Sequence, residues 1–67
     1  MDAQKIGNKI KSLRTERRAT QAELANYAGV TKVAISNYER GLRVPRDEVK
    51  KKIADFLDTS IAGLFYS

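Results

Sequence analysis

Apolar residues recur along this 67-residue chain at steps of three and four residues, the spacing of one face of an amphipathic helix. No stretch alternates between apolar and polar residues as a β-strand does. The pattern predicts helices over about residues 3–17, 21–28, 32–40 and 46–57, and a last short helical turn that starts at Thr59 or Ser60. The expected buried stripes are Ala3, Ile6, Ile10 and Leu13; Leu24, Ala25 and Ala28; Val30, Ile35 and Tyr38; Val49, Ile53, Phe56 and Leu57; and Ile61, Leu64 and Phe65. Residues 1–67 are therefore predicted to form a single all-α domain.

Polar residues and glycines between the stripes mark the helix ends. Thr20 lies three residues before Glu23, which is the spacing of a capping box that starts a helix. Gly29 fits a helix stop because glycine enters the left-handed backbone region without strain. Thr31 fits the cap of the next helix, and Gly41 fits its end. The segment from about residue 21 to residue 40 is thus two short helices joined by a tight turn, the arrangement of a helix-turn-helix.

The composition narrows the chemistry that the chain can perform. It contains neither cysteine nor histidine, so a disulfide framework, a thiolate metal site and the commonest general base are excluded. Asp55 and Asp58 are expected to share a helix face, where solvation explains them. We therefore expect no enzyme, no metal site and no cofactor. Residues 1–9 lack a secretory signal, and no apolar run approaches the roughly 20 residues that span a bilayer, so no membrane partner is expected.

The net charge of +5 is unevenly distributed along the chain. Residues 1–46 hold ten Lys and Arg against four Asp and Glu, a net +6, whereas residues 47–67 hold three against four, a net −1. Such a positive field favours a polyanionic partner, such as nucleic acid or an acidic membrane surface. The alternative is a basic surface that only keeps the protein soluble. The lysines at positions 50–52 are expected to form the solvated face of their helix.

The helix-turn-helix segment and its surroundings resemble the phage repressor and Cro type of helix-turn-helix proteins, also called the XRE type. The resemblance extends from Ile6 to Phe65 and is carried by Ile10, Leu13 and Arg14; residues 20–25; residues 29–31; residues 35–41; Pro45; and Ile53, Ala54 and Leu57. It implies a compact five-helix bundle of the lambda-repressor-like type. It also implies a transcriptional regulator that binds double-stranded DNA as a homodimer, with helix 32–40 in the major groove of a near-palindromic operator. Such a protein is expected in the cytoplasm of a bacterium, encoded by the bacterium or by a phage.

The residue types at the matching positions agree with the roles that the resemblance implies. Since Ile35 and Tyr38 define the buried face of helix 32–40, the opposite face is open to base edges. Lysine donates to guanine, asparagine bonds adenine and valine contacts a thymine methyl group. The resemblance places the base contacts at Lys32, Val33, Ser36 and Asn37. It places the phosphate contacts, which the amides at the start of helix 21–28 also favour, at Gln21, Arg40, Arg43 and Arg46.

Three groups of residues have two interpretations each. Arg14 and Glu39 match an ion pair of similar proteins that fixes the first helix against the third, or they are unrelated surface charges. The side chains of residues 17 and 18, both arginines, contact phosphates or form a solvated helix end. The apolar C-terminal residues close the small core or contact a second copy; they are Leu64, Phe65 and Tyr66.

A second function class is a protein-interaction module. Some proteins of this shape act as antitoxins, anti-repressors or co-regulators, mainly through a regulatory protein partner. The contact surface would then be the C-terminal segment 64–66. Specific DNA binding by the protein alone distinguishes the regulator from such a module.

Overall fold

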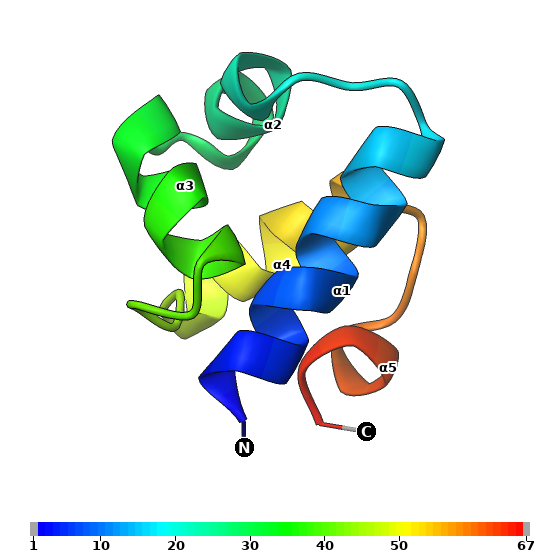
Figure 1. Ribbon diagram of the computed structural model, residues 1–67. Coiled ribbons are helices and arrows are strands. Elements are labelled where there is room, and N and C mark those ends of the chain that lie inside the picture. The colour runs from blue at the N-terminus through cyan, green and yellow to red at the C-terminus, as the bar shows by residue number, and fades with distance from the viewer. Residues whose placement is uncertain (1, 67) are drawn as a thin grey trace.

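The computed structural model describes residues 2–66 and arranges them in five helices (Figure 1). They are α1 (Ala3–Glu16), α2 (Gln21–Ala28), α3 (Lys32–Glu39), α4 (Asp47–Phe56) and α5 (Ile61–Phe65). None of the described residues lies in a strand, so the predicted all-α five-helix fold is confirmed. The predicted bounds of the first four helices are right to within one residue, and the last helix starts at Ile61 rather than at Thr59 or Ser60. Several predicted terminal residues are caps: Arg17, Arg40, Arg46 and Leu57.

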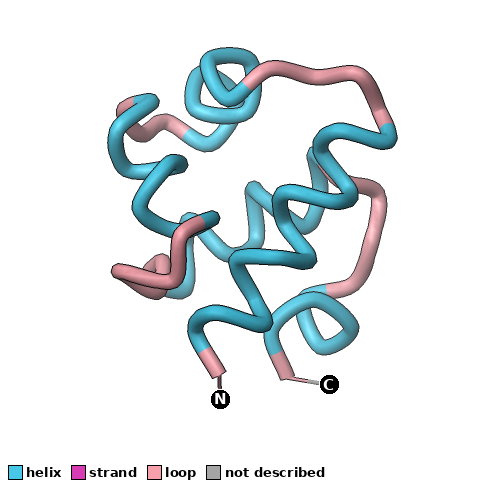
Figure 2. The backbone as a smooth tube through the Cα atoms, in the orientation of Figure 1, coloured by secondary structure: helices cyan, strands magenta, loops and turns pink. Residues whose placement is uncertain are grey.

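The helices pack in a closed arrangement around one centre. α1 contacts α3 and α5, α2 contacts α3 and α4, and α4 contacts α5. The start of α1 and the end of α5 lie on the same side of the bundle, opposite α2 (Figure 1). Short loops join the helices, and the longest of them, residues 40–46, follows α3 (Figure 2).

Every helix contributes one large, fully buried side chain to the core. These side chains are Ile10, Leu24, Ile35, Ile53 and Leu64, and none is more than 1% exposed. Burial of this kind contributes roughly 1.5–3 kcal/mol per side chain. Because a chain of this size builds only one core, each helix depends on the other four for its stability.

Side-chain caps set the starts of four helices. Asp2 accepts hydrogen bonds from the amides of the first turn of α1, and Thr31 and Ser60 do the same for α3 and α5. The capping box at α2 is confirmed: the Glu23 amide donates to Thr20 Oγ1 at 3.0 Å, and the Thr20 amide donates to Glu23 Oε1 at 2.8 Å. The chain thus encodes these helix starts locally, independently of the core.

α1 and the end of α3 approach each other closely at Gly7. A Cβ atom placed on Gly7 would lie 2.5 Å from the carbonyl oxygen of Glu39, and the carbonyl oxygen of Tyr38 would also obstruct it. Real Cβ atoms do not approach backbone atoms this closely. Gly7 is therefore required by the packing of α1 on α3, although it lies inside a helix, where glycine is otherwise unfavourable.

The C-terminal segment closes the core. Leu64 and Phe65 are only 1% and 2% exposed, so their side chains have no surface to offer a second copy. The interpretation of these two residues as a dimer contact is wrong, because α5 needs them to pack on α1 and α4. Tyr66 is 58% exposed and remains on the surface.

Lys50 is also buried, contrary to the prediction that residues 50–52 form a solvated face. It is 7% exposed, and its Nζ donates to the hydroxyl oxygen of Tyr66 at 2.8 Å. The ammonium group lies 5.6 Å and 4.9 Å from the ring centroids of Phe65 and Tyr66, and 3.7 Å from Asp47 Oδ1. The apolar spacing of α4 does not predict this contact, because the two aromatic rings lie at the end of α5. Residues 51 and 52 are exposed, as predicted.

We expect Tyr66→Phe to lower the free energy of unfolding at neutral pH by about 1 kcal/mol, because it removes the acceptor of a charged donor. The hydrogen bond to Tyr66 raises the pKa of Lys50 above its ordinary value of 10.5. A raised folded-state pKa contributes stability that is complete below the ordinary pKa and is lost as pH rises through the raised value. As the pH rises through the alkaline range, the free energy of unfolding, measured with denaturant, should therefore fall less for Tyr66→Phe than for the unmodified protein. Tyr27→Phe is the control, and an equal effect from it would contradict the assignment.

Candidate nucleic-acid interface

α2 and α3 are held at a fixed angle by a three-residue turn. Gly29 has a left-handed φ of 73°, and its amide donates to the carbonyl oxygen of Ala25. Thr31 then caps α3 by accepting from the Ala34 amide at 3.0 Å. The inner sides of the two helices are buried and include the small side chains of Ala25 and Ala34, which are 4% and 8% exposed. The sequence-predicted helix-turn-helix is thus present over α2 and α3.

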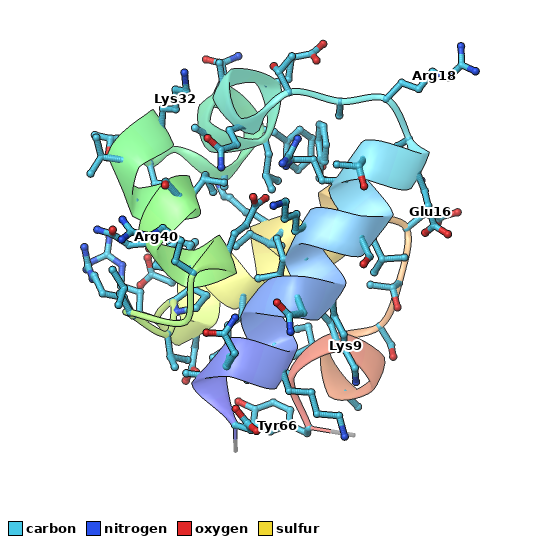
Figure 3. The ribbon with its side chains drawn as sticks, viewed as in Figure 1. Lys9, Glu16, Arg18, Lys32, Arg40 and Tyr66 are labelled. Carbon is cyan, nitrogen blue, oxygen red and sulfur yellow. The ribbon has the colours of Figure 1, made fainter. Side chains whose placement is uncertain are left out.

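The outer side of α3 presents a largely polar face. Ala34, Ile35, Tyr38 and Glu39 form its buried side. The four predicted base-contacting residues all lie on the other side. Lys32 and Val33 are exposed, and Ser36 and Asn37, one turn later, are half-buried. Figure 3 shows the Lys32 side chain extending outward from the start of α3.

Val33 is the informative member of this face. Its side chain is 68% exposed on a helix whose opposite side is buried. An aliphatic side chain in this position does not contribute to the core, since Ile35 is the fully buried residue of α3. A singly exposed valine is common on protein surfaces, so Val33 alone does not show a partner; it is placed where the resemblance implies a base contact.

Exposed arginines border the polar face of α3. Arg40 caps the end of α3, Arg43 lies in the loop after it, and Arg46 caps the start of α4. The Arg43 guanidinium lies 5.9 Å from the ring centroid of Tyr38, which holds it near α3. The two arginines at the end of α1 are exposed as well, and Arg18 points away from the bundle (Figure 3). This placement is compatible with both interpretations of residues 17 and 18.

A shallow hollow lies between the end of α1, the start of α2 and the start of α3. We call it the Gln21 hollow, and it is lined by Arg14, Ala19, Thr20, Gln21, Ala22 and Lys32. The start of α2 and the cationic side chain of Lys32 therefore meet at one depression in the surface, where the charge of Arg14 is balanced by Glu39. Anions are stabilised by both features.

A buried carboxylate connects this hollow to α3. Arg14 Nε donates to Glu39 Oε2 at 2.6 Å and Arg14 Nη2 donates to Glu39 Oε1 at 3.1 Å, so the pair is bidentate. The side chains of Arg14 and Glu39 are 11% and 2% exposed, which rules out the interpretation as unrelated surface charges. Arg14 Nη1 also donates to the carbonyl oxygen of Ala19 at 2.9 Å. The hydrogen bonds to Glu39 raise the pKa of Arg14 above its already high ordinary value.

Gln21 is the third member of this network. The resemblance implies that this glutamine braces helix 32–40, but the sequence did not identify Glu39 as its partner. Gln21 Nε2 donates to Glu39 Oε1 at 3.0 Å. The two residues are 18 positions apart, and no local spacing relates them. A side-chain amide carries two hydrogens, and Glu39 accepts one of those of Gln21. Gln21 is therefore oriented by the same carboxylate that joins α1 to α3.

Among the described residues, 2–66, no group of three or more His, Cys, Asp or Glu side chains is placed to hold a metal ion. Asp55 lies in α4, but Asp58 follows the helix with a left-handed φ of 54°, so the expectation that they share a helix face is wrong. Within the same residues, no helix has both the length and the apolar character needed to cross a membrane.

Comparison with protein families places the chain unambiguously. A model of the helix-turn-helix family HTH_3 matches residues 10–64. The chain belongs to this family. The resemblance to repressor and Cro-type proteins is thereby confirmed, and the matched segment includes every helix from the middle of α1 to α5.

Two curated relatives carry repressor names. The chain is 40% identical over 62 residues to the HTH-type transcriptional repressor RghR of Bacillus subtilis. The aligned segment covers 91% of the chain and 46% of that protein. It is 42% identical over 59 residues to the cryptic phage CTXphi transcriptional repressor RstR of Vibrio cholerae. This second alignment covers 88% of the chain and 53% of that protein. The chain therefore spans about half the length of these curated relatives.

A solved DNA complex has the same fold. The structure of the P22 c2 repressor protein with a synthetic operator superposes with a TM-score of 0.88 at 31% identity. The match covers 91% of this chain and 92% of the repressor chain. The five-helix arrangement is thus that of a lambda-repressor-like helix-turn-helix domain.

Proposed function

We propose that this chain is the sequence-specific, double-stranded DNA-binding domain of a transcriptional repressor, and that α3 enters the major groove. The observation that carries the proposal is the outer face of α3, where side chains of base-reading types lie beside the exposed arginines of the segment 40–46. Membership of the helix-turn-helix family and the repressor names of its relatives support it. They favour a DNA-binding regulator over a module that acts through a protein partner. Such a regulator acts where bacterial DNA lies, in the cytoplasm, and needs no catalytic group.

Base reading is assigned to the four side chains on the outer face of α3. Lys32 donates to guanine, Asn37 bonds an adenine edge, and Val33 contacts thymine methyl groups. Ser36 lies between them and bonds either kind of base. The exposed valine makes the proposal specific, because an apolar base contact selects thymine over cytosine.

Phosphate binding is assigned to the border of this face. The Gln21 hollow takes one phosphate, which is bound by the second Nε2 hydrogen of Gln21, the first amides of α2 and the ammonium group of Lys32. Arg40, Arg43 and Arg46 bind phosphates on the other side of α3. These contacts contribute affinity and orientation without reading sequence. Two copies bound to a near-palindromic site would place two α3 helices about one DNA turn, roughly 34 Å, apart.

The proposal is tested by selecting the purified protein against a random double-stranded DNA library at near-physiological salt, followed by sequencing of the bound pool. We expect enrichment of an inverted repeat whose half-sites lie about one helical turn apart. Binding that is salt-sensitive but enriches no sequence would contradict the proposal.

We expect Asn37→Ala and Arg43→Ala to weaken DNA binding in different ways. Asn37→Ala should weaken binding to the selected site roughly 10- to 100-fold and leave random DNA nearly unaffected, because it removes a base contact. Arg43→Ala should weaken binding to both DNAs alike and reduce the salt dependence by about one counterion. Fluorescence titrations with both DNAs over a salt series measure each effect. Equal loss on both DNAs for Asn37→Ala would remove that residue from the base-reading set.

A further inference from the structure

Val33 differs in chemistry from the other three side chains that are proposed to read bases. Lys32, Ser36 and Asn37 carry hydrogen-bond donors or acceptors, so each matches an oxygen or nitrogen atom on a base edge. Val33 has neither, although its side chain is 68% exposed. The apolar group that an unmodified base pair presents in the major groove is the 5-methyl group of thymine. Val33 therefore recognises a methyl group, and no other feature of the base that carries it.

The first turn of α3 holds Val33 in a fixed position. Val33 is the second residue of α3, and the N-terminal residues of a recognition helix are the ones that contact base edges. Thr31 caps this turn by accepting from the Ala34 amide at 3.0 Å. Ala34 and Ile35, which follow Val33, are buried in the core. Since a β-branched side chain has one strongly preferred rotamer in a helix, Val33 presents a rigid apolar surface that does not adjust to each base.

A modified base carries the same methyl group as thymine. In 5-methylcytosine the methyl group is attached to the same ring carbon, and it projects into the major groove at the same place. The two bases differ at the neighbouring ring carbon, where thymine has a carbonyl acceptor and cytosine has an amino donor. A valine forms a hydrogen bond with neither group. Val33 therefore distinguishes a methylated pyrimidine from an unmethylated one, but it does not distinguish thymine from 5-methylcytosine.

Lys32, which directly precedes Val33, favours the guanine that pairs with a methylated cytosine. Its ammonium group is a donor without acceptors, and guanine presents two acceptors in the major groove. Lys32 is exposed and extends outward from the start of α3 (Figure 3). The first turn of α3 thus places a donor for guanine beside an apolar contact for a methyl group. This combination suits a pair of 5-methylcytosine and guanine as well as it suits thymine.

We infer that this protein reads cytosine methylation: a 5-methylcytosine that faces Val33 is bound as thymine is, and more tightly than unmethylated cytosine. This response rests on the proposed DNA-binding function and extends it, because the affinity changes while the base sequence stays the same. Burial of one methyl group corresponds to about a fourfold change in affinity for one half-site, and thus to roughly 15-fold for a site with two. A cytosine methyltransferase that acts on the operator would therefore strengthen repression.

The test starts from the operator that the library selection yields. Each thymine is replaced in turn by deoxyuridine, which removes only the methyl group, and the affinity is measured by fluorescence titration. The thymine that faces Val33 is the one whose replacement weakens binding by the unmodified protein about fourfold per half-site and leaves binding by Val33→Ala unchanged. Cytosine or 5-methylcytosine, each paired with guanine, is then placed at this position. We expect 5-methylcytosine to bind about fourfold more tightly than cytosine per half-site, and Val33→Ala to bind both alike.

Two controls separate the methyl contact from other effects. A 5-methylcytosine placed outside both half-sites should leave the affinity unchanged. Val33→Ala shortens an exposed side chain, so the variant should fold as the unmodified protein does, which circular dichroism checks.

Three results would overturn the inference. A thymine scan in which no position responds would show that Val33 faces no methyl group. Equal affinity for cytosine and 5-methylcytosine at the responding position would confine the contact to thymine. A gain on methylation that is as large in Val33→Ala would show that the methyl group acts through the shape of the DNA. Failure of the proposed function looks different, since the unmodified protein would then select no site at all.

Discussion

Glu39→Ala should lower the free energy of unfolding by about 3–5 kcal/mol, because it leaves a nearly buried guanidinium without its carboxylate. Arg14 is 11% exposed, and it loses two hydrogen bonds at 2.6 Å and 3.1 Å. Gln21 loses its acceptor at the same time. The total stability of a domain of this length is roughly 5 kcal/mol, so the variant should be largely unfolded at ambient temperature.

Urea unfolding followed by circular dichroism measures this effect. Glu48→Ala is the matched control, since it removes an exposed carboxylate from the first turn of α4 and should cost no more than about 1 kcal/mol. The double variant Arg14→Met/Glu39→Met separates the cost of an unpaired charge from the value of the pair. It should be more stable than Glu39→Ala, because it leaves no charge unpaired. A loss below about 1 kcal/mol for Glu39→Ala would show that the pair behaves as an exposed surface pair.

The helices could be predicted from the sequence because their signals are local. Apolar spacing, the Thr20–Glu23 capping box and Gly29 each act over a few residues, and all three are where the sequence places them. Two helices, α1 and α4, are followed by a left-handed residue that is not glycine. Arg18 has a left-handed φ of 56°, which its residue type does not indicate, and Asp58 has one of 54°, which aspartate adopts more readily.

The errors in the prediction concern contacts between distant segments. Lys50 looks like one of three solvated lysines until α5 brings Phe65 and Tyr66 to it. For the same reason, an apolar chain end was consistent with both a core element and a dimer contact. A single sequence carries the pattern of one helix face, but the partner of that face depends on the packing of the whole bundle.

The candidate interface divides in the same way. The exposed face of α3 follows from helix geometry once Ile35 and Tyr38 are buried, and the structure has this arrangement. The link between Gln21 and Glu39 appears only in three dimensions, because it joins the start of α2 to the end of α3. The individual base and phosphate contacts remain predictions, which the Asn37 and Arg43 variants test.

Gly7→Ala should lower the free energy of unfolding by about 2–3 kcal/mol, although alanine is the better helix former by about 1 kcal/mol. The added methyl group would lie 2.5 Å from the Glu39 carbonyl oxygen. Since the obstructing atoms belong to the backbone, no side-chain rotation relieves the contact, and α1 must move away from α3. That movement would also strain the Arg14–Glu39 pair, which joins the same two helices.

Gly29→Ala provides the comparison for this effect. Gly29 has a left-handed φ, but a Cβ atom there would meet nothing within 4 Å, so only backbone strain of about 1 kcal/mol is expected. In thermal unfolding, the melting temperature of Gly7→Ala should therefore be well below that of Gly29→Ala. Helix propensity and backbone strain alone predict the opposite order. If Gly7→Ala instead stabilised the protein, α1 and α3 would have to lie farther apart than the structure places them, and Gly7 would be an ordinary helix position.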